Sequence, residues 1–211
     1  MKALLVLDGN VPSREKILEL ESQSDVLIAA DGAANALCNL HIEPDLVIGD
    51  FDSLDQKTRR TFSSAEFLHR SGQDDTDFEK ALAHLKEMGA RDVVVVGAVG
   101  KRMDHSLAHF FLSWRFVSSM RIRFYDDQTW NFLLPQGTWH FSVRPSTTMS
   151  LIPMAPMEVS LFGFEYNLEK KSTPLGYAGV SNVVRENPCT IVVGDPGGMA
   201  IFLSQDVQCL S

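Results

Sequence analysis

Short apolar runs alternate with amphipathic stretches along the first two thirds of the chain. Several runs are apolar at consecutive positions, which is typical of parallel strands buried on both faces. The expected strands are Ala3–Leu7, Val26–Ala30, Leu46–Ile48, Val93–Val96 and Ile122–Tyr125. The stretches between them, with helical spacing or composition, are Pro12–Ser24, Gly32–Leu40, Ser53–Ser64, Thr76–Met88 and Met103–Ser119. This pattern predicts a βα alternation around a parallel sheet.

The pattern changes after about Pro135. Charged residues become sparse, and short apolar runs are separated by Pro and Gly, which indicates small antiparallel β-structure. These runs are Trp139–Val143, Met149–Ile152, Val180–Val184, Thr190–Val193 and Met199–Leu203. We therefore expect an α/β protein of two domains, with a parallel-sheet domain at residues 1–135 and a β domain at residues 136–211.

Composition and charge exclude several classes of protein. The 211 residues are 45% hydrophobic and 22% charged, as in an ordinary globular protein. The formal net charge of −8 and the lack of a basic run argue against nucleic-acid binding. The longest apolar run, Val93–Gly100, has eight residues, far fewer than the roughly 20 that a membrane span needs. We recognise no export signal, and three scattered cysteines fit a reducing cytoplasm.

Nearly every expected strand of the first domain is followed by Asp or Gly. Taken singly, such residues are usually turn or helix-capping residues. In a parallel sheet, however, the carboxyl ends of the strands meet at one edge, where ligands bind. The acids expected to meet there are Asp31, Asp50 and Asp52, together with Asp74, Asp75 and Asp77 at the start of the next helix.

Such a group of acids needs a counter-charge. Two like charges about 4 Å apart repel by on the order of 4 kcal/mol at an effective dielectric near 20. Mg²⁺ offsets this repulsion, since it commonly takes one or two carboxylates and bridges to substrate phosphates. Asp50 and Asp52 point the same way if their segment is extended, which suits a shared metal ion. The alternative is a plain loop in which Ser53 caps the next helix.

A glycine-rich turn, Gly97–Arg102, follows the strongest apolar run of the first domain. Its small residues let the backbone approach a phosphate, and Lys101 and Arg102 add positive charge. It is not a Walker loop, because the glycine spacing differs and no Ser or Thr follows the Lys. Alone, the turn is equally compatible with solvated cations, but beside an acidic metal site it indicates a polyphosphate held for transfer.

His105 and His109 lie four residues apart on the last expected helix of this domain. They share a helix face, but the Glu of a His-Glu-x-x-His zinc motif is absent. We expect a packed or solvated pair rather than a metal site.

Four segments together resemble the thiamine pyrophosphokinase family, in order and spacing along nearly the whole chain. They are Asp31–Asn35 (DGAAN), Pro44–Ser53 (PDLVIGDFDS), Gln73–Leu82 (QDDTDFEKAL) and Gly100–His105 (GKRMDH). The resemblance implies a nucleotide-binding α/β domain, a C-terminal β-sandwich for thiamine binding and dimerisation, and a homodimer with its sites between subunits. It also implies Mg²⁺-dependent transfer of a pyrophosphoryl group from ATP to the hydroxyl of thiamine, which gives thiamine diphosphate and AMP.

The resemblance assigns roles by position. Mg²⁺ and the phosphates would be held by Asp50, Asp52 and Asp77, while Lys80 or Arg102 offsets charge on the leaving AMP. The residues implied to line the nucleotide and phosphate region are Asp31, Gln73, Thr76, Lys80, Arg102 and Asp104. The substrate-side candidates are Ser181 and Asn182, from a Val-Ser-Asn segment that is similar to one near thiamine in the family.

The chain departs from the family pattern at two places. Pro196–Ala200 stands where animal members have a Trp that stacks on thiamine, so we expect the stacking partner to come from elsewhere. Lys101 and Met103 occupy positions where Gly and Phe are common, so the resemblance does not fix the phosphate contacts of this turn.

Three other functions share parts of this pattern. A pyrophosphokinase for another hydroxymethyl heterocycle, such as a pterin, would differ only in the C-terminal pocket. A nucleotide or thiamine sensor would bind ligand without forming AMP. A metal-dependent phosphohydrolase would release phosphate without any acceptor.

Overall fold

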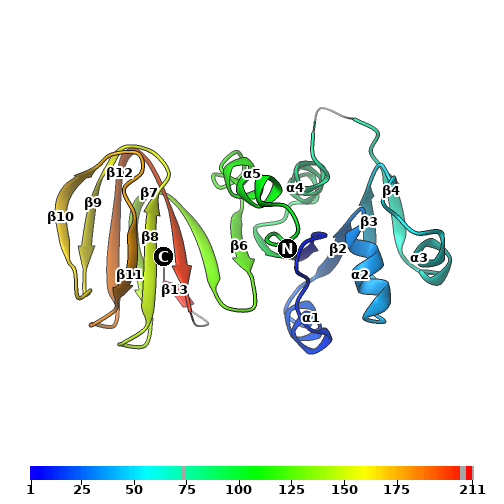
Figure 1. Ribbon diagram of the computed structural model, residues 1–211, viewed down its shortest axis with the longest axis horizontal. Coiled ribbons are helices and arrows are strands. Elements are labelled where there is room, and N and C mark those ends of the chain that lie inside the picture. Colours follow the sequence, from blue (N-terminus) through cyan, green and yellow to red (C-terminus); the bar gives the residue numbers. More distant parts are fainter. Residues whose placement is uncertain (73–74, 205–207, 211) are drawn as a thin grey trace. The chain divides into compact units, whose positions relative to one another are not determined.

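The computed structural model describes residues 1–72, 75–204 and 208–210. The chain forms an α/β fold with two compact units, Met1–Asp127 and Gln128–Ser211 (Figure 1). Within the described residues, no helix has the length and apolar character that a membrane crossing requires.

The first unit alternates strands and helices, as the sequence pattern predicts. Its strands are β1 (Lys2–Val6), β2 (Val26–Ala30), β3 (Leu46–Gly49), β4 (Glu66–His69), β5 (Asp92–Val96) and β6 (Arg121–Tyr125). Its helices are α1 (Arg14–Glu21), α2 (Ala33–Asn39), α3 (Gln56–Thr61), α4 (Asp77–Glu87) and α5 (Met103–Ser113). The five expected strands and five expected helices are all present, and β4 is an additional strand.

The described strands of this unit pair in parallel in the order β6-β5-β1-β2-β3-β4. Figure 1 shows α1 and α2 on one face of these strands and α4 and α5 on the other. Coverage of both faces explains the consecutive burial of Leu4, Leu5 and Val6 in β1, and of Val95 and Val96 in β5. Strand β4 is only half-buried at its two central residues, so it lacks such a run.

The chain reverses direction across the sheet between β1 and β5. From β1 it continues outward through β2, β3 and β4, and then returns to pair β5 with the other side of β1. Crevices that bind ligands form at such reversals, beyond the carboxyl ends of the strands.

The loops after β1 and β5 are joined by their backbones. Beyond the strand ends, Gly9 N–H donates to Gly97 O (2.8 Å) and Asn10 N–H donates to Val99 O (2.7 Å). Gly97 has a φ of +70°, and a Cβ there would lie 2.1 Å from the carbonyl oxygen of Leu7. Only glycine lets the two loops approach this closely.

The second unit consists of antiparallel strands. They are β7 (Trp130–Ser142), β8 (Thr148–Pro153), β9 (Met157–Phe162), β10 (Leu168–Thr173), β11 (Gly179–Val183), β12 (Cys189–Leu203) and β13 (Gln208–Leu210). The central strand β12 pairs with β7 along its length, with β9 through its first half and with β8 through its second half.

Strand β12 corrects one expectation from the sequence. Thr190–Val193 and Met199–Leu203 were expected as separate strands, but they are two parts of β12. The Pro and Gly residues between them shift the register between Val193 and Gly198 instead of making a turn.

Candidate active site

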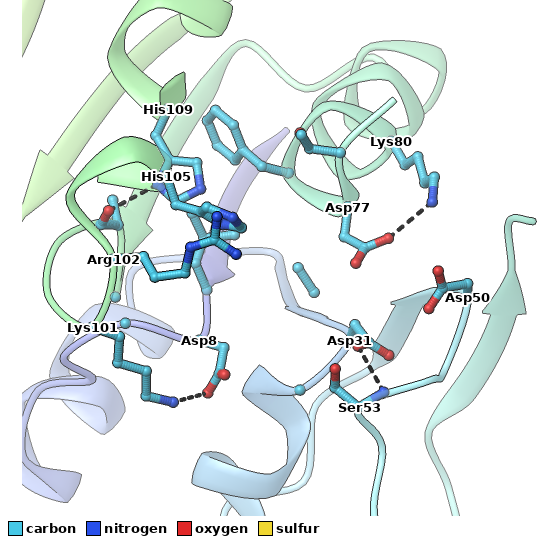
Figure 2. Close-up of a pocket in the computed structure, with 18 of the residues that line it drawn as sticks. Asp8, Asp31, Asp50, Ser53, Asp77, Lys80, Lys101, Arg102, His105 and His109 are labelled. Carbon is cyan, nitrogen blue, oxygen red and sulfur yellow. Dashed lines mark hydrogen bonds and ion pairs between the residues drawn. The ribbon is translucent and has the colours of Figure 1, made fainter. Parts of the chain in front are cut away.

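A cavity of about 560 Å³ lies at the carboxyl ends of β1, β2, β3 and β5 (Figure 2). Its wall combines acids, cations, glycines and two histidines. The polar residues that line it include Asp8, Asp31, Asp50, Ser53, Asp75, Thr76, Asp77, Lys80, Lys101, Arg102, His105 and His109. The cavity therefore lies at the sheet edge where the sequence predicts ligand binding.

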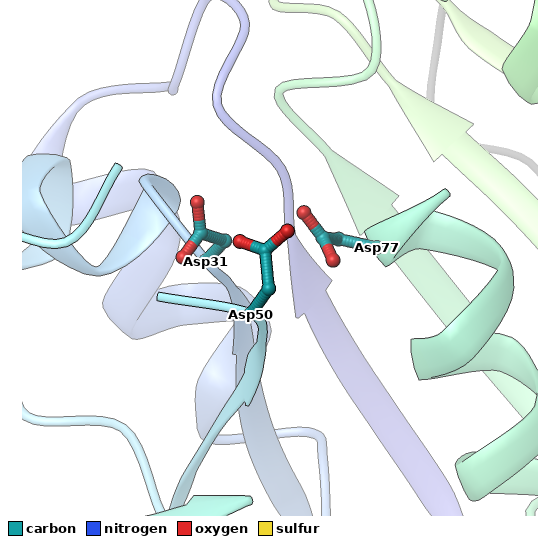
Figure 3. A group of neighbouring side chains, drawn as sticks. All are labelled: Asp31, Asp50 and Asp77. Atoms are coloured by element: carbon teal, nitrogen blue, oxygen red, sulfur yellow. The ribbon is translucent and has the colours of Figure 1, made fainter. Parts of the chain in front are cut away.

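Three carboxylates from different elements meet in this cavity (Figure 3). Asp31 follows β2, Asp50 follows β3, and Asp77 is the first residue of α4. One carboxylate oxygen from each lies within 4.8 Å of the others, which is close enough to share a metal ion. The structure thus brings Asp50 and Asp77 together, as expected, and adds Asp31 to them.

Asp31 is the buried member of this group, with 6% of its surface exposed. Its Oδ2 accepts a hydrogen bond from Ser53 N–H (3.2 Å), but its buried Oδ1 has no partner among the described residues. Burial raises the pKa of Asp31, and the nearby charges of Asp77 and Asp50 raise it further, against the hydrogen bond from Ser53. An unpartnered carboxylate oxygen beside two other acids fits a hard divalent cation.

Asp52 lies outside this group of carboxylates. The segment is not extended, because Phe51 has a φ of +68°, so Asp50 and Asp52 are not held in the alternating geometry of a strand. Asp52 is exposed, and its backbone N–H donates to Asp50 Oδ1 (3.1 Å). Its backbone therefore orients Asp50, and metal binding by its own carboxylate stays a prediction.

The start of α4 places Asp77 and Lys80 in the cavity. Thr76 caps the helix, since its Oγ1 accepts from Glu79 N–H (3.2 Å). Lys80 Nζ lies 3.0 Å from Asp77 Oδ1, and its side chain is 9% exposed. Phe78, Leu82 and other apolar residues anchor the helix on its buried face. Gln73, another expected nucleotide contact, lies outside the described residues.

The glycine-rich turn carries two cations at the opposite side of the cavity (Figure 2). Lys101 has a φ of +48°, and its Nζ lies 2.6 Å from Asp8 Oδ1. Arg102 lines the cavity and forms two hydrogen bonds with Asp104, an exposed residue in the first turn of α5. The guanidinium of Arg102 lowers the pKa of Asp104 to about 2.

The structure also brings His105 and His109 to the cavity. His109 Nδ1 lies 2.8 Å from Ala98 O, and because a carbonyl only accepts, Nδ1 carries the hydrogen and Nε2 is left as an acceptor. Burial lowers the pKa of His109, so the ring is neutral near pH 7. Its edge contacts Phe78, with the ring centres 4.9 Å apart. From the sequence, helical spacing predicts only that the two rings lie on the same face of the helix. It does not predict that this face lines the cavity.

The substrate-side candidates lie in the second unit, on β11. Asn182 is buried, its Nδ2 donates to Tyr166 O (2.9 Å), and its Oδ1 accepts from Tyr166 N–H (3.1 Å). Asn182 and Tyr166 line a largely apolar hollow of about 290 Å³. Tyr166 is 67% exposed there. Ser181 is exposed, with a φ of +59°, and its backbone N–H donates to Ser150 Oγ (3.0 Å).

Comparisons with known proteins find similarity to thiamin pyrophosphokinases along most of the chain. A family model described as thiamin pyrophosphokinase, catalytic domain, matches residues 17–125, and one described as its vitamin B1 binding domain matches residues 140–196. The thiamine pyrophosphokinase of Bacillus subtilis (strain 168) is 30% identical over 186 residues, which cover 83% of this chain and 86% of that relative. Thiamine pyrophosphokinase 1 of Oryza sativa subsp. japonica is 28% identical over 222 residues, which cover 90% of this chain and 82% of the relative.

Solved structures show the same fold. The crystal structure of a thiamin pyrophosphokinase from Geobacillus thermodenitrificans has a TM-score of 0.83 at 25% identity, and the match covers 100% of both chains. The yeast thiamin pyrophosphokinase structure has a TM-score of 0.84 at 15% identity, with 99% of this chain and 86% of that chain covered. At that identity, the yeast structure supports the fold alone.

Proposed function

This chain belongs to the thiamin pyrophosphokinase family, and we infer that it is an enzyme that transfers pyrophosphate from ATP to thiamine. The products are thiamine diphosphate and AMP. The observation that carries this function is the cavity in which three carboxylates face a glycine-rich turn with two cations. A sensor that only binds ligand has no use for acids that repel one another and the phosphates they meet.

Mg²⁺ fits the carboxylate group, since Asp31 Oδ1 is buried without a partner and each acid offers a hard oxygen ligand. We propose that Asp50 and Asp77 hold the ion and that Asp31 completes the group. When bound, the ion draws charge from the triphosphate. The sequence also predicts Asp52 as a metal ligand, and this role is tested by comparing the Mg²⁺ affinity of Asp52→Asn with that of Asp50→Asn. Equal losses of Mg²⁺ affinity in the two variants support the role of Asp52 as a ligand, and an unchanged affinity in Asp52→Asn would contradict it.

The remaining cavity residues orient the nucleotide and its phosphates. Lys80 and Arg102 are placed to offset negative charge on the phosphates and on the leaving AMP. Thr76 fixes the start of α4, and with it the position of Asp77. Asp104 holds the guanidinium of Arg102. Gln73 completes the proposed nucleotide contacts from the sequence.

The transfer needs mainly correct positioning. The oxygen of the thiamine hydroxyl forms a bond to the β-phosphorus of ATP, and the bond from that phosphorus to the α,β-bridging oxygen breaks. AMP leaves with the bridging oxygen, and the hydroxyl proton is released. Most of the acceleration comes from holding the two reactants in line and from balancing charge on the phosphates.

We propose that residues 1–135 form the nucleotide-binding catalytic domain and residues 136–211 a β-sandwich that binds thiamine and forms the dimer. The parallel pairing of β1 to β6 supports the first assignment. The change of partners along β12, from β9 in its first half to β8 in its second half, supports the second, since a strand that passes from one sheet of a sandwich to the other changes partners in this way. Ser181 and Asn182 are the proposed thiamine-side residues, beside the hollow in the domain that matches the vitamin B1 binding model.

Mass spectrometry of the products tests the function. The chain is incubated with ATP and thiamine, or ATP and a hydroxymethyl pterin, with and without Mg²⁺. We expect equal amounts of thiamine diphosphate and AMP, only when Mg²⁺ and thiamine are both present. AMP formed with the pterin instead would show another acceptor, and inorganic phosphate formed without any acceptor would show a hydrolase.

Two variants connect this reaction to the cavity. Asp77→Asn should lose turnover by roughly a hundredfold or more, because a charge that the transition state needs is removed. Glu87→Gln, at the exposed far end of the same helix, is the matched control and should retain turnover. Near-normal turnover in Asp77→Asn would contradict the proposed role of Asp77.

The homodimer is also a proposal, supported by the family resemblance. Light scattering of the purified chain measures its mass in solution. A mass of about twice 23.5 kDa supports the dimer, and a monomer that retains turnover would contradict it.

A further inference from the structure

Each cation of the catalytic cavity is neutralised by an aspartate. Among the described lining residues, the Lys and Arg side chains are Lys80, Lys101 and Arg102. Lys80 pairs with Asp77 (3.0 Å), Lys101 with Asp8 (2.6 Å) and Arg102 with Asp104. Figure 2 draws the first two of these pairs as dashed lines, one on the first turn of α4 and one between the loops after β1 and β5. A polyphosphate that enters the cavity can therefore bind these Lys and Arg side chains only by displacing their aspartate partners.

The pair between Asp8 and Lys101 crosses the point where the sheet reverses direction. Asp8 follows β1, and Lys101 follows β5 by five residues, so the pair joins the two loops that flank the crevice. The backbones of these loops are already fastened by the hydrogen bonds of Gly9 and Asn10. The ion pair is thus not needed to hold the loops together.

Exposure of the pair supports the same conclusion. The side chains of Asp8 and Lys101 are 48% and 58% exposed, and ion pairs in water contribute little to folding. Lys101 also has a left-handed backbone, with a φ of +48°, where glycine would be free of strain. A strained lysine that adds little to stability, on the wall of a binding cavity, indicates a ligand for its ammonium group.

We propose that Asp8 sets the affinity for nucleotide, because its carboxylate and a phosphate of the nucleotide compete for the ammonium group of Lys101. This inference rests on the proposed function, which places a polyphosphate in the cavity. On binding, Lys101 leaves Asp8 for a phosphate oxygen. After transfer, return of Lys101 to Asp8 favours the release of AMP.

Asp8 is the partner that isolates this exchange. Asp77 belongs to the carboxylate group proposed for Mg²⁺, so its substitution changes metal binding as well. Asp104 lies two residues from Arg102 and is exposed on α5, where it also stabilises the helix start. Among the described residues, the carboxylates close enough to share a metal ion are those of Asp31, Asp50 and Asp77, and Asp8 is not one of them.

A double-mutant cycle tests the competition. Calorimetry measures binding of a non-hydrolysable ATP analogue with Mg²⁺ to the wild type, Asp8→Asn, Lys101→Met and the double variant. Asp8→Asn should tighten binding by about two- to fivefold, since an exposed ion pair of this strength no longer competes. Lys101→Met should weaken binding by roughly tenfold. Asp8→Asn should have no further effect when Lys101 is replaced.

The cycle separates competition from simple repulsion. If Asp8→Asn tightens binding equally with and without Lys101, Asp8 acts by repelling phosphate, and the proposal is overturned. Unchanged or weaker binding in Asp8→Asn alone overturns it too. Lys101→Gly, which removes the backbone strain, repeats the test without a risk to folding, and Lys57→Met on α3 is the control for loss of an exposed lysine.

Turnover of the wild type distinguishes failure of this proposal from failure of the function. If the wild type forms AMP and thiamine diphosphate but the cycle shows no coupling, only the competition is wrong. If the wild type neither binds the analogue nor forms AMP, both proposals fail.

Discussion

Among single residues, the carboxylate of Asp31 matters most for the proposed cation site. It is buried beside Asp50 and Asp77, and one of its oxygens has no partner within the described parts of the chain. Such an arrangement costs stability until a cation is bound, because charged oxygens without partners are unfavourable in a buried site. A site of this kind sacrifices stability for function.

Replacing Asp31 with Asn should therefore stabilise the protein in the absence of divalent cations. We expect about 1 kcal/mol at pH 7, as is typical when a strained functional group is removed, together with loss of Mg²⁺ binding. Thermal unfolding with and without Mg²⁺ measures both effects. Two results would contradict the role of Asp31. One is that Asp31→Asn is less stable than the wild type in the absence of Mg²⁺, and the other is that Mg²⁺ stabilises Asp31→Asn as much as it stabilises the wild type.

The pH dependence of this effect has a definite sign. The folded protein raises the pKa of Asp31 above its ordinary 3.8, so the folded state holds this proton more tightly than the unfolded state. Without divalent cations, the contribution of Asp31 to stability is present below pH 3.8 and is lost as the pH rises through the raised pKa. The stability advantage of Asp31→Asn should thus grow from pH 4 towards pH 7 and shrink when Mg²⁺ is added.

Part of this site could be predicted from the sequence. Asp50 and Asp77 could be predicted because parallel strands end at one edge and because Asp77 opens the next expected helix. The contact of Asp8 with Lys101 could not, since 93 residues separate them and only the strand order brings them together. The turn at Phe51, which breaks the extended geometry between Asp50 and Asp52, has no signal in its residue types.

Among the helices and strands, α4 places two charged side chains, Asp77 and Lys80, in the wall of the cavity. Its cap by Thr76 and its apolar face fix the first turn, where Asp77 and Lys80 meet the other acids. The helix itself was predicted from the sequence as Thr76–Met88, because helical spacing is a local signal.

The cap gives a prediction for this element. Thr76→Ala removes the acceptor for Glu79 N–H and should cost about 1 kcal/mol of stability, while the frayed first turn weakens Mg²⁺ binding through Asp77. Thr76→Ser keeps the hydroxyl and serves as the control. Chemical denaturation and Mg²⁺ titration measure the two effects, and equal behaviour of the Ala and Ser variants would show that the cap does not position Asp77.

The junction of the loops after β1 and β5 gives a second prediction. Gly97→Ala places a Cβ 2.1 Å from Leu7 O at a φ of +70°. Gly89→Ala is a matched control, because Gly89 has a φ of +81° but no atom within 4 Å of its added Cβ. Gly89→Ala should cost only the backbone strain, about 1 kcal/mol. Gly97→Ala should cost clearly more and weaken nucleotide binding, and equal stability of the two variants would contradict the close approach.

Some elements carried too little signal to be predicted. Strand β10 is exposed at four consecutive positions, so it lacks an apolar run, and β9 lies in a segment interrupted by polar residues. Strands β1, β2, β3 and β5 were predicted well for the opposite reason, since burial on both faces makes them largely apolar.

At the scale of the whole molecule, charge controls what the cavity accepts. The chain has a formal net charge of −8, and its acids repel a free triphosphate. A nucleotide that arrives with Mg²⁺ brings the cation that the carboxylates need. Binding of both together should therefore be much stronger than binding of the nucleotide alone.

Thermal unfolding measures this coupling. A ligand at a hundred times its dissociation constant stabilises the folded state by about 2.7 kcal/mol. We expect a stabilisation of this order from an ATP analogue with Mg²⁺, little from the analogue alone, and none in Asp77→Asn. Equal stabilisation with and without Mg²⁺ would show that the carboxylates do not take part in nucleotide binding.

Catalysis by this chain depends on Asp31, Asp50 and Asp77 holding the cation that accompanies ATP. Anomalous diffraction from crystals grown with Mn²⁺ and a non-hydrolysable ATP analogue tests it directly. We predict a peak among these three carboxylates and against the triphosphate. A peak elsewhere, or carboxylates turned apart into bulk water with the nucleotide bound, would contradict the account.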